Sequence, residues 1–93
     1  MNLDQIRKFY AVAINKSFTI AAENMFRTQP AINTQVRMLE KELDARLFDR
    51  IGKKVCLTLT GDVLFTYAER LLTLHDEVKL PVAALTPRPK AGS

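Results

Sequence analysis

Three polar side chains lie near the start of one predicted helix: Gln29, Asn33 and Thr34. The two amides both donate and accept hydrogen bonds, and the threonine adds a hydroxyl and a methyl group. Side chains of this kind read base edges in the major groove of duplex DNA, where methyl groups contact thymine. Polar residues that simply face water are the alternative. We interpret the set as a base-reading surface, which the surrounding elements must hold in place.

Basic residues concentrate around this set. The 93-residue chain carries 14 basic and 10 acidic residues, a net charge of +4. Its pI is near 9.5. A local excess of positive charge is typical of a polyanion partner, although many unrelated small domains are equally basic. The segment 27–54 has four acidic residues against seven basic ones, namely Arg27, Arg37, Lys41, Arg46, Arg50, Lys53 and Lys54.

The rest of the composition argues against catalysis. His75 is the one histidine and lies beside Asp76 and Glu77, which favours a solvated or interface side chain. Cys56 is the one cysteine, so no internal disulfide forms, and a reducing cytoplasm is the expected setting. The apolar stretches are too short to span a membrane. We expect no enzyme activity, no cofactor and no metal.

Hydrophobic periodicity predicts three helices, at residues 1–16, 20–26 and 29–43. Thr19 is the predicted N-cap of the second helix, and Thr28 that of the third. Pro30 suits the first turn of the third helix, where its missing N–H costs nothing. One apolar stripe on the third helix consists of Ile32, Val36, Leu39 and Leu43.

The pattern changes after residue 47. Alternation over 48–59, around Gly52, Lys53 and Lys54, predicts a small hairpin with a basic tip. Thr60 is the predicted N-cap of a long fourth helix that reaches about residue 80, where Pro81 is expected to end it. The expected divisions are a domain at 1–59, a helix at 60–80 and a flexible tail at 81–93.

Five segments resemble the LysR-type transcriptional regulators. They read FTIAAE at 18–23, TQPAINTQV at 28–36, LEKEL at 39–43, LFDR at 47–50 and LTLTG at 57–61. The likeness extends over about residues 2–80, which makes it specific. It implies a mainly α fold: a winged helix-turn-helix of three helices and a small β-hairpin wing, followed by a long linker and dimerisation helix.

The resemblance also implies DNA-contacting positions. Asn33 and Thr34 stand where the family usually has serine and often a basic or polar residue, so the preferred bases are expected to differ. Lys53 and Lys54 fall in the wing, which is expected on the minor groove or on phosphates. The predicted DNA-binding residues are Arg27, Thr28, Gln29, Pro30, Asn33, Thr34, Arg37, Arg50, Lys53 and Lys54.

The fourth helix has apolar residues on more of its surface than a small core needs to cover. The surplus predicts contact with a second copy of the chain, and the resemblance implies the same: a homodimer through antiparallel linker helices. Packing of the whole strip on the first three helices is the alternative. The predicted dimer residues are Leu64, Phe65, Ala68, Leu71, Leu72, His75 and Val78.

These observations favour a bacterial-type regulator domain that binds double-stranded DNA as a homodimer. A two-fold protein is expected to bind an interrupted palindromic operator. The resemblance implies that a small-molecule effector would act only through a C-terminal domain, which is absent from this chain. The alternative is a winged-helix module that binds protein, which would need an apolar surface where Gln29, Asn33 and Thr34 are polar.

Overall fold

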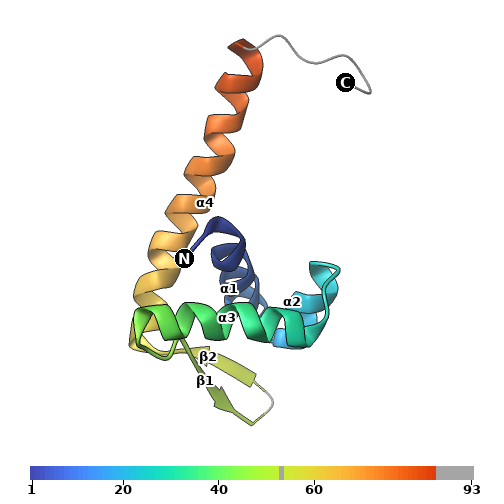
Figure 1. Cartoon of the computed structure of the whole chain (residues 1–93), viewed down its shortest axis with the longest axis vertical. Coiled ribbons are helices and arrows are strands. Elements are labelled where there is room, and N and C mark those ends of the chain that lie inside the picture. Colours follow the sequence, from blue (N-terminus) through green and yellow to red (C-terminus); the bar gives the residue numbers. More distant parts are fainter. Residues whose placement is uncertain (53, 86–93) are drawn as a thin grey trace.

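The computed structural model describes residues 1–52 and 54–85 and has six elements (Figure 1). Three helices and a two-stranded antiparallel hairpin form a compact body, from which one long helix projects. This is the mainly α architecture expected from the sequence. The elements are α1 (Leu3–Asn15), α2 (Phe18–Asn24), α3 (Gln29–Leu43), β1 (Phe48–Ile51), β2 (Lys54–Leu57) and α4 (Leu59–Leu85).

Side-chain caps fix where the first three helices begin. Asn2 caps α1 by accepting from the N–H of Gln5. Thr28 caps α3, as predicted, by accepting from the N–H of Ala31. The prediction for α2 is wrong, because Ser17 is the cap and its hydroxyl accepts from the N–H of Ile20. Each such bond satisfies a helical N–H that has no partner within the helix.

In the described part of the chain, three residues other than glycine have a left-handed backbone conformation: one directly after α1, one in the turn after α2 and one directly after α3. They are Lys16, Phe26 and Asp44, with φ of 52°, 55° and 50°. At Phe26 the N–H donates to the carbonyl of Glu23, and the next N–H, of Arg27, donates to that of Ala22. These paired bonds use the last free carbonyls of α2 and reverse the chain toward α3. The sharp turn of the helix-turn-helix is therefore made without glycine.

An aromatic cluster holds the helices and the hairpin together. Phe9 of α1 lies 5.2 Å from Phe48 of β1, and Phe18 of α2 meets Phe48 edge-on at 5.7 Å, between ring centroids. Offset and edge-on rings add to the stabilisation that burial of their area gives. The other buried apolar residues are Ile6, Val12, Ala21, Ala22, Ile32, Val36, Leu39, Leu47, Val55 and Ala68.

The hairpin presents one face to this core. Phe48 pairs with Leu57 and Arg50 with Val55, so the buried Phe48 and Val55 share the inner side. Cys56 lies on the opposite side of β2 and is exposed. Arg50 shares the inner side toward the end of β1 and is exposed, while Asp49 lies on the outer side.

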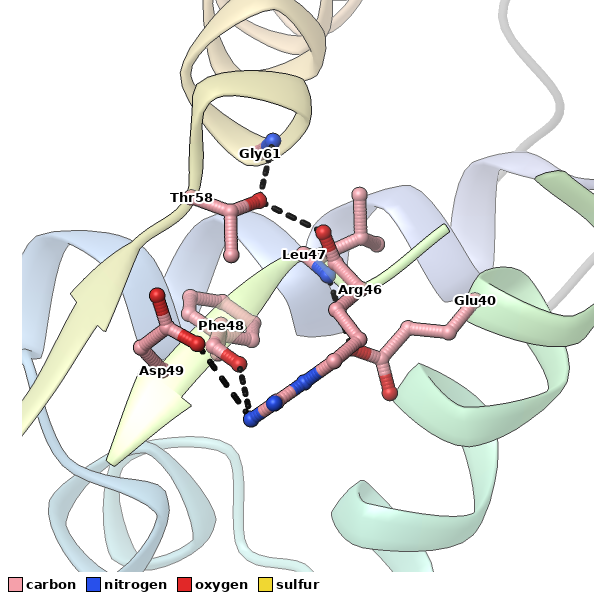
Figure 2. A network of polar contacts seen from close by, with 7 residues as sticks. All are labelled: Glu40, Arg46, Leu47, Phe48, Asp49, Thr58 and Gly61. Atoms are coloured by element: carbon pink, nitrogen blue, oxygen red, sulfur yellow. Dashed lines mark hydrogen bonds and ion pairs between the residues drawn. The ribbon is translucent and has the colours of Figure 1, made fainter. Parts of the chain in front are cut away.

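Thr58 and Gly61 tie the hairpin to α3 and α4 (Figure 2). The Thr58 hydroxyl donates to the carbonyl of Arg46 at 2.5 Å and accepts from the N–H of Gly61 at 3.0 Å. The N–H of Thr58 donates to the carbonyl of Leu47, whose own N–H donates to the Glu40 carboxylate at 2.8 Å. This chain of bonds links the end of α3, the start of β1 and the first turn of α4.

The long helix differs from its predicted bounds at both ends. The Thr58 hydroxyl, rather than that of Thr60, accepts from the first turn, and α4 begins at Leu59. The helix continues through Pro81 to Leu85, because a proline removes one helical hydrogen bond without always ending the helix. The expectation of a tail from residue 81 is therefore wrong for 81–85, and residues 86–93 lie outside the described part.

We predict that Gly61→Ala lowers the free energy of unfolding by about 3 kcal/mol, because overpacking against a rigid backbone is costly. A Cβ at Gly61 would lie 2.1 Å from the carbonyl oxygen of Leu47. Gly52→Ala is the control, since open space surrounds that position and only its positive φ is strained. It should cost about 1 kcal/mol. Urea unfolding measures both; an equal or smaller loss for Gly61→Ala would contradict the close approach.

Candidate nucleic-acid interface

The α3 helix buries one side and exposes the other. Ile32, Val36 and Leu39 are buried against α1 and α2, while Leu43 lies at the border of the core and is partly exposed. Two of the predicted base readers, Gln29 and Thr34, are exposed, and Asn33 is half-buried. The helix thus keeps a polar surface beside an apolar one, as its sequence pattern predicts.

Gln29 and Thr34 both make defined hydrogen bonds. The hydroxyl of Thr19, in the first turn of α2, donates to Oε1 of Gln29 at 3.0 Å. The hydroxyl of Thr34 donates to the carbonyl of Pro30 at 2.9 Å, one turn back along α3. The Thr34 hydroxyl proton is therefore used within the helix, which leaves its oxygen as an acceptor and its methyl group as an apolar contact.

Asn33 is linked to the wing through Arg50. Nη2 of Arg50 donates to Oδ1 of Asn33 at 3.4 Å, from β1 to α3. The Arg50 guanidinium also lies 5.0 Å from the centroid of the Phe18 ring. A cation over an aromatic face is attracted by the ring's negative charge density. Arg50 is thus held between an aromatic ring and the amide of a predicted base reader.

A hollow of about 490 Å³ lies between α3 and β1. Three arginines and one glutamate give its rim a net positive charge. The Glu40 carboxylate accepts from the Leu47 N–H, and Arg46 donates to Asp49 and to the carbonyl of Phe48. The hollow is lined by Phe18, Asn33, Val36, Arg37, Glu40, Arg46, Phe48 and Arg50.

The other described residues of the predicted DNA-binding set lie near the start of α3 and on the hairpin. Arg27 is exposed in the turn before α3, and Thr28 and Pro30 form the start of that helix. Lys54 is exposed at the start of β2. Lys53 lies outside the described residues. The structure therefore gathers the described residues of the predicted set on α3, the turn before it and the hairpin (Figure 1).

Sequence reasoning missed two residues of this surface. Thr19 is predicted to cap a helix, but Ser17 has that role and Thr19 contacts Gln29 instead. Arg46, which the sequence places only within the basic segment, lines the hollow. The LFDR segment nearby fixes where β1 begins and could have indicated that the preceding arginine lies beside it.

The predicted dimer strip on α4 divides into two. Ala68 is completely buried within one chain, so its assignment to a dimer contact is wrong. Leu64, Phe65 and Leu72 pack against the core of their own chain, and the Phe65 ring stacks on Tyr10 at 5.0 Å. A second, exposed apolar stripe consists of Val63, Tyr67, Leu71, Leu74 and Val78.

His75 is also half-covered by its own chain. Nη2 of Arg7 lies 3.1 Å from Nδ1 of His75 and 3.8 Å from the Asp76 carboxylate. These contacts join α1 to the middle of α4. Of the predicted dimer residues, only Leu71 and Val78 lie on the exposed stripe.

Across 1–52 and 54–85, no three histidine, cysteine or acidic side chains cluster closely enough to hold a metal ion. None of the helices in that part combines the length and apolar character needed to cross a membrane.

The three helices, the hairpin that follows α3 and the long helix after it define a winged helix-turn-helix protein. The sequence matches the family described as bacterial regulatory helix-turn-helix protein, lysR family, over residues 3–62. That span runs from the start of α1 to the first turn of α4, which is most of the chain. The chain belongs to the lysR family, and the resemblance seen in the sequence is confirmed.

Similar proteins support the assignment. Probable RuBisCO transcriptional regulators of Cyanidioschyzon merolae and of Nostoc sp. are 45% and 44% identical over 75 residues. These alignments cover 81% of this chain, but 25% and 22% of the two relatives. The chain thus spans about a quarter of the length of the curated relatives it matches.

Solved structures confirm the fold. The DNA-binding domain of BenM in complex with benA site 1 DNA has a TM-score of 0.87 and 32% identity, covering 92% of this chain and 100% of that chain. The CbnR DNA-binding domain in complex with DNA has a TM-score of 0.84 and 30% identity, covering 90% and 97%. Full-length CbnR, a LysR family transcriptional regulator, has a TM-score of 0.85 and 30% identity, with 29% of its chain covered.

Proposed function

We propose that the chain binds double-stranded DNA sequence-specifically, as the DNA-binding domain of a transcription regulator. One observation carries the proposal: α3 buries its apolar side while its N-terminal residues Gln29, Asn33 and Thr34 stand at the surface. Helix-turn-helix proteins insert the N-terminal part of this helix into the major groove. The similarity to domains solved in complex with DNA supports a DNA-binding role.

The hollow between α3 and β1 suits a DNA backbone. Arg37, Arg46 and Arg50 line it. We assign phosphate contacts to Arg37 and Arg46, because arginine pairs with phosphate through a planar set of donors. With α3 in the major groove, the hairpin would lie over the adjacent backbone or minor groove. Lys54 on β2 would add a further phosphate contact.

We assign homodimer formation to the exposed stripe on α4. Val63, Tyr67, Leu71, Leu74 and Val78 recur at three- and four-residue steps and are each at least 42% exposed. Such a stripe on a projecting helix is suited to packing against the same helix of a second copy. Two copies would present two α3 helices to an interrupted palindrome.

The curated relatives are longer than this chain. Because the chain spans about a quarter of its relatives, we assign control by a small-molecule effector to a region that those relatives have in addition. A regulator of this class acts on the chromosome in the cytoplasm and has no enzyme activity. A protein-binding role for the α3 surface is disfavoured because that surface is polar and bordered by arginines.

The test of base reading is Gln29→Ala. We expect it to weaken binding to a selected duplex by about 1–3 kcal/mol while changing binding to a random duplex little, because a base contact carries sequence information and a phosphate contact does not. Fluorescence anisotropy at several salt concentrations measures both affinities, and the salt slope should be unchanged.

Gln35→Ala is the matched control for this test. Gln35 is the same residue type on the same helix, but six positions further on, about 240° around its axis. It is half-buried, and the substitution should leave discrimination between the two duplexes intact. Equal losses on selected and random duplexes for Gln29→Ala would contradict its role as a base reader.

The test of the dimer stripe compares Leu71→Glu with Ala68→Glu. Leu71 is 42% exposed, so a charge there should leave the fold and its helical circular dichroism intact while it prevents pairing. Ala68 is completely buried, so the same charge there should unfold the domain. Sedimentation should show a folded Leu71→Glu monomer with weakened operator binding. A wild-type chain that stays monomeric even on palindromic DNA would overturn the assignment.

A further inference from the structure

Two amide side chains at the start of α3 have their carbonyl oxygens turned toward neighbouring elements. Thr19 of α2 donates to Oε1 of Gln29, and Arg50 of β1 donates to Oδ1 of Asn33. We propose that Thr19 and Arg50 are positioning residues that orient both amides with their NH₂ groups outward. The chain would then select bases that present acceptors without an adjacent donor: guanine, through N7 and O6, and thymine, through O4. The proposal rests on the DNA-binding function above.

The chemistry of Arg50 fixes the orientation of Asn33. A guanidinium donates hydrogen bonds but accepts none, so its partner on Asn33 must be the carbonyl oxygen. Rotating the amide by half a turn would set two donors against each other. Arg50 is itself held over the Phe18 ring, which packs edge-on against Phe48 in the core. The orientation of Asn33 is therefore tied to the rigid part of the fold.

Thr19 contacts Gln29 through a hydroxyl group, which can accept as well as donate, so this contact favours the same orientation without the strict constraint that the guanidinium of Arg50 imposes. The 3.0 Å separation joins the hydroxyl oxygen to the carbonyl oxygen Oε1, and a carbonyl cannot donate, so Thr19 does. Its hydroxyl is free for this bond because Ser17, two residues earlier, caps α2. The first turn of α2 thus orients the first residue of α3.

The orientation of the two amides restricts which bases they pair with. An amide reads adenine bidentately by accepting from N6 while it donates to N7. When the carbonyl oxygen is directed at a protein donor, the outward NH₂ group favours an acceptor edge instead. Guanine offers N7 and O6 there, and thymine offers O4. Thr34 fits this pattern, because its hydroxyl donates within α3 and its methyl group remains for a thymine methyl.

A direct phosphate contact by Arg50 makes a different prediction. A phosphate contact strengthens binding to every sequence and increases the salt dependence. A positioning role changes the ratio between right and wrong bases and acts only while Asn33 is present. Arg46 provides a matched control, since it lines the same hollow but donates to Asp49 and to the Phe48 carbonyl, not to Asn33.

The experiment begins with selection of duplexes by the wild-type chain from a library with a randomised core. Affinities are then measured for the selected duplex and for each single base-pair change. We expect guanine or thymine at the position that Asn33→Ala relaxes. In an otherwise wild-type chain, Arg50→Met should reduce discrimination between the right and wrong bases at that position about fivefold. In the Asn33→Ala background the same substitution should leave discrimination unchanged, because two residues that act as a pair lose their coupling when either one is removed.

Two further variants keep the test decisive. Arg46→Met should weaken binding to all duplexes without changing their ratios. Thr19→Val, which keeps the shape and removes the donor, should relax the base read by Gln29 even if Arg50→Met fails to fold by circular dichroism. Uniform loss for Arg50→Met in both backgrounds, or adenine at both amide-read positions, would overturn the proposal. If the wild-type chain enriches no sequence, the proposed function itself fails, which is a separate result.

Discussion

The first turn of α4 passes so close to the backbone of Leu47 that a side chain at Gly61 has no room. Thr58 reinforces this approach by bonding to Arg46, Leu47 and the first turn of α4 (Figure 2). The Leu47 N–H also donates to the Glu40 carboxylate of α3, so a single hydrogen-bond network fixes the start of the wing relative to α3 and to the start of α4. The spacing between the predicted DNA surface and the projecting helix depends on it.

The polar surface of α3 depends in turn on the aromatic cluster behind it. Phe48 of the wing packs on Phe9 and Phe18, which brings β1 beside α3. This placement lets Arg50 reach Asn33 and lets Arg46 line the same hollow. Hydrophobic packing thus sets the positions of charged groups that no local sequence preference would bring together. The lysR family assignment and the geometry support the same DNA-binding role.

Local signals in the sequence predicted much of the fold. The apolar repeat of Ile32, Val36 and Leu39, with Thr28 as cap, gave α3 its observed bounds. Competing local signals were less informative: Ser17 and Thr19 are both good caps, and only tertiary contacts decide between them. The buried Ala68 and the exposed Leu71 belong to neighbouring strips of α4, and spacing alone does not show which strip meets the core. The Asn33–Arg50 contact joins residues 17 apart and has no periodic signature.

The fold and the polar surface of α3 together imply that the N-terminal part of this helix meets the bases. Nuclear magnetic resonance of the ¹⁵N-labelled chain, titrated with a selected duplex, can detect that contact. We expect the side-chain NH₂ signals of Gln29 and Asn33 to shift on binding and to become protected from exchange with water. Protection absent from both amides, with shifts confined to surfaces remote from α3 and the hairpin, would contradict it.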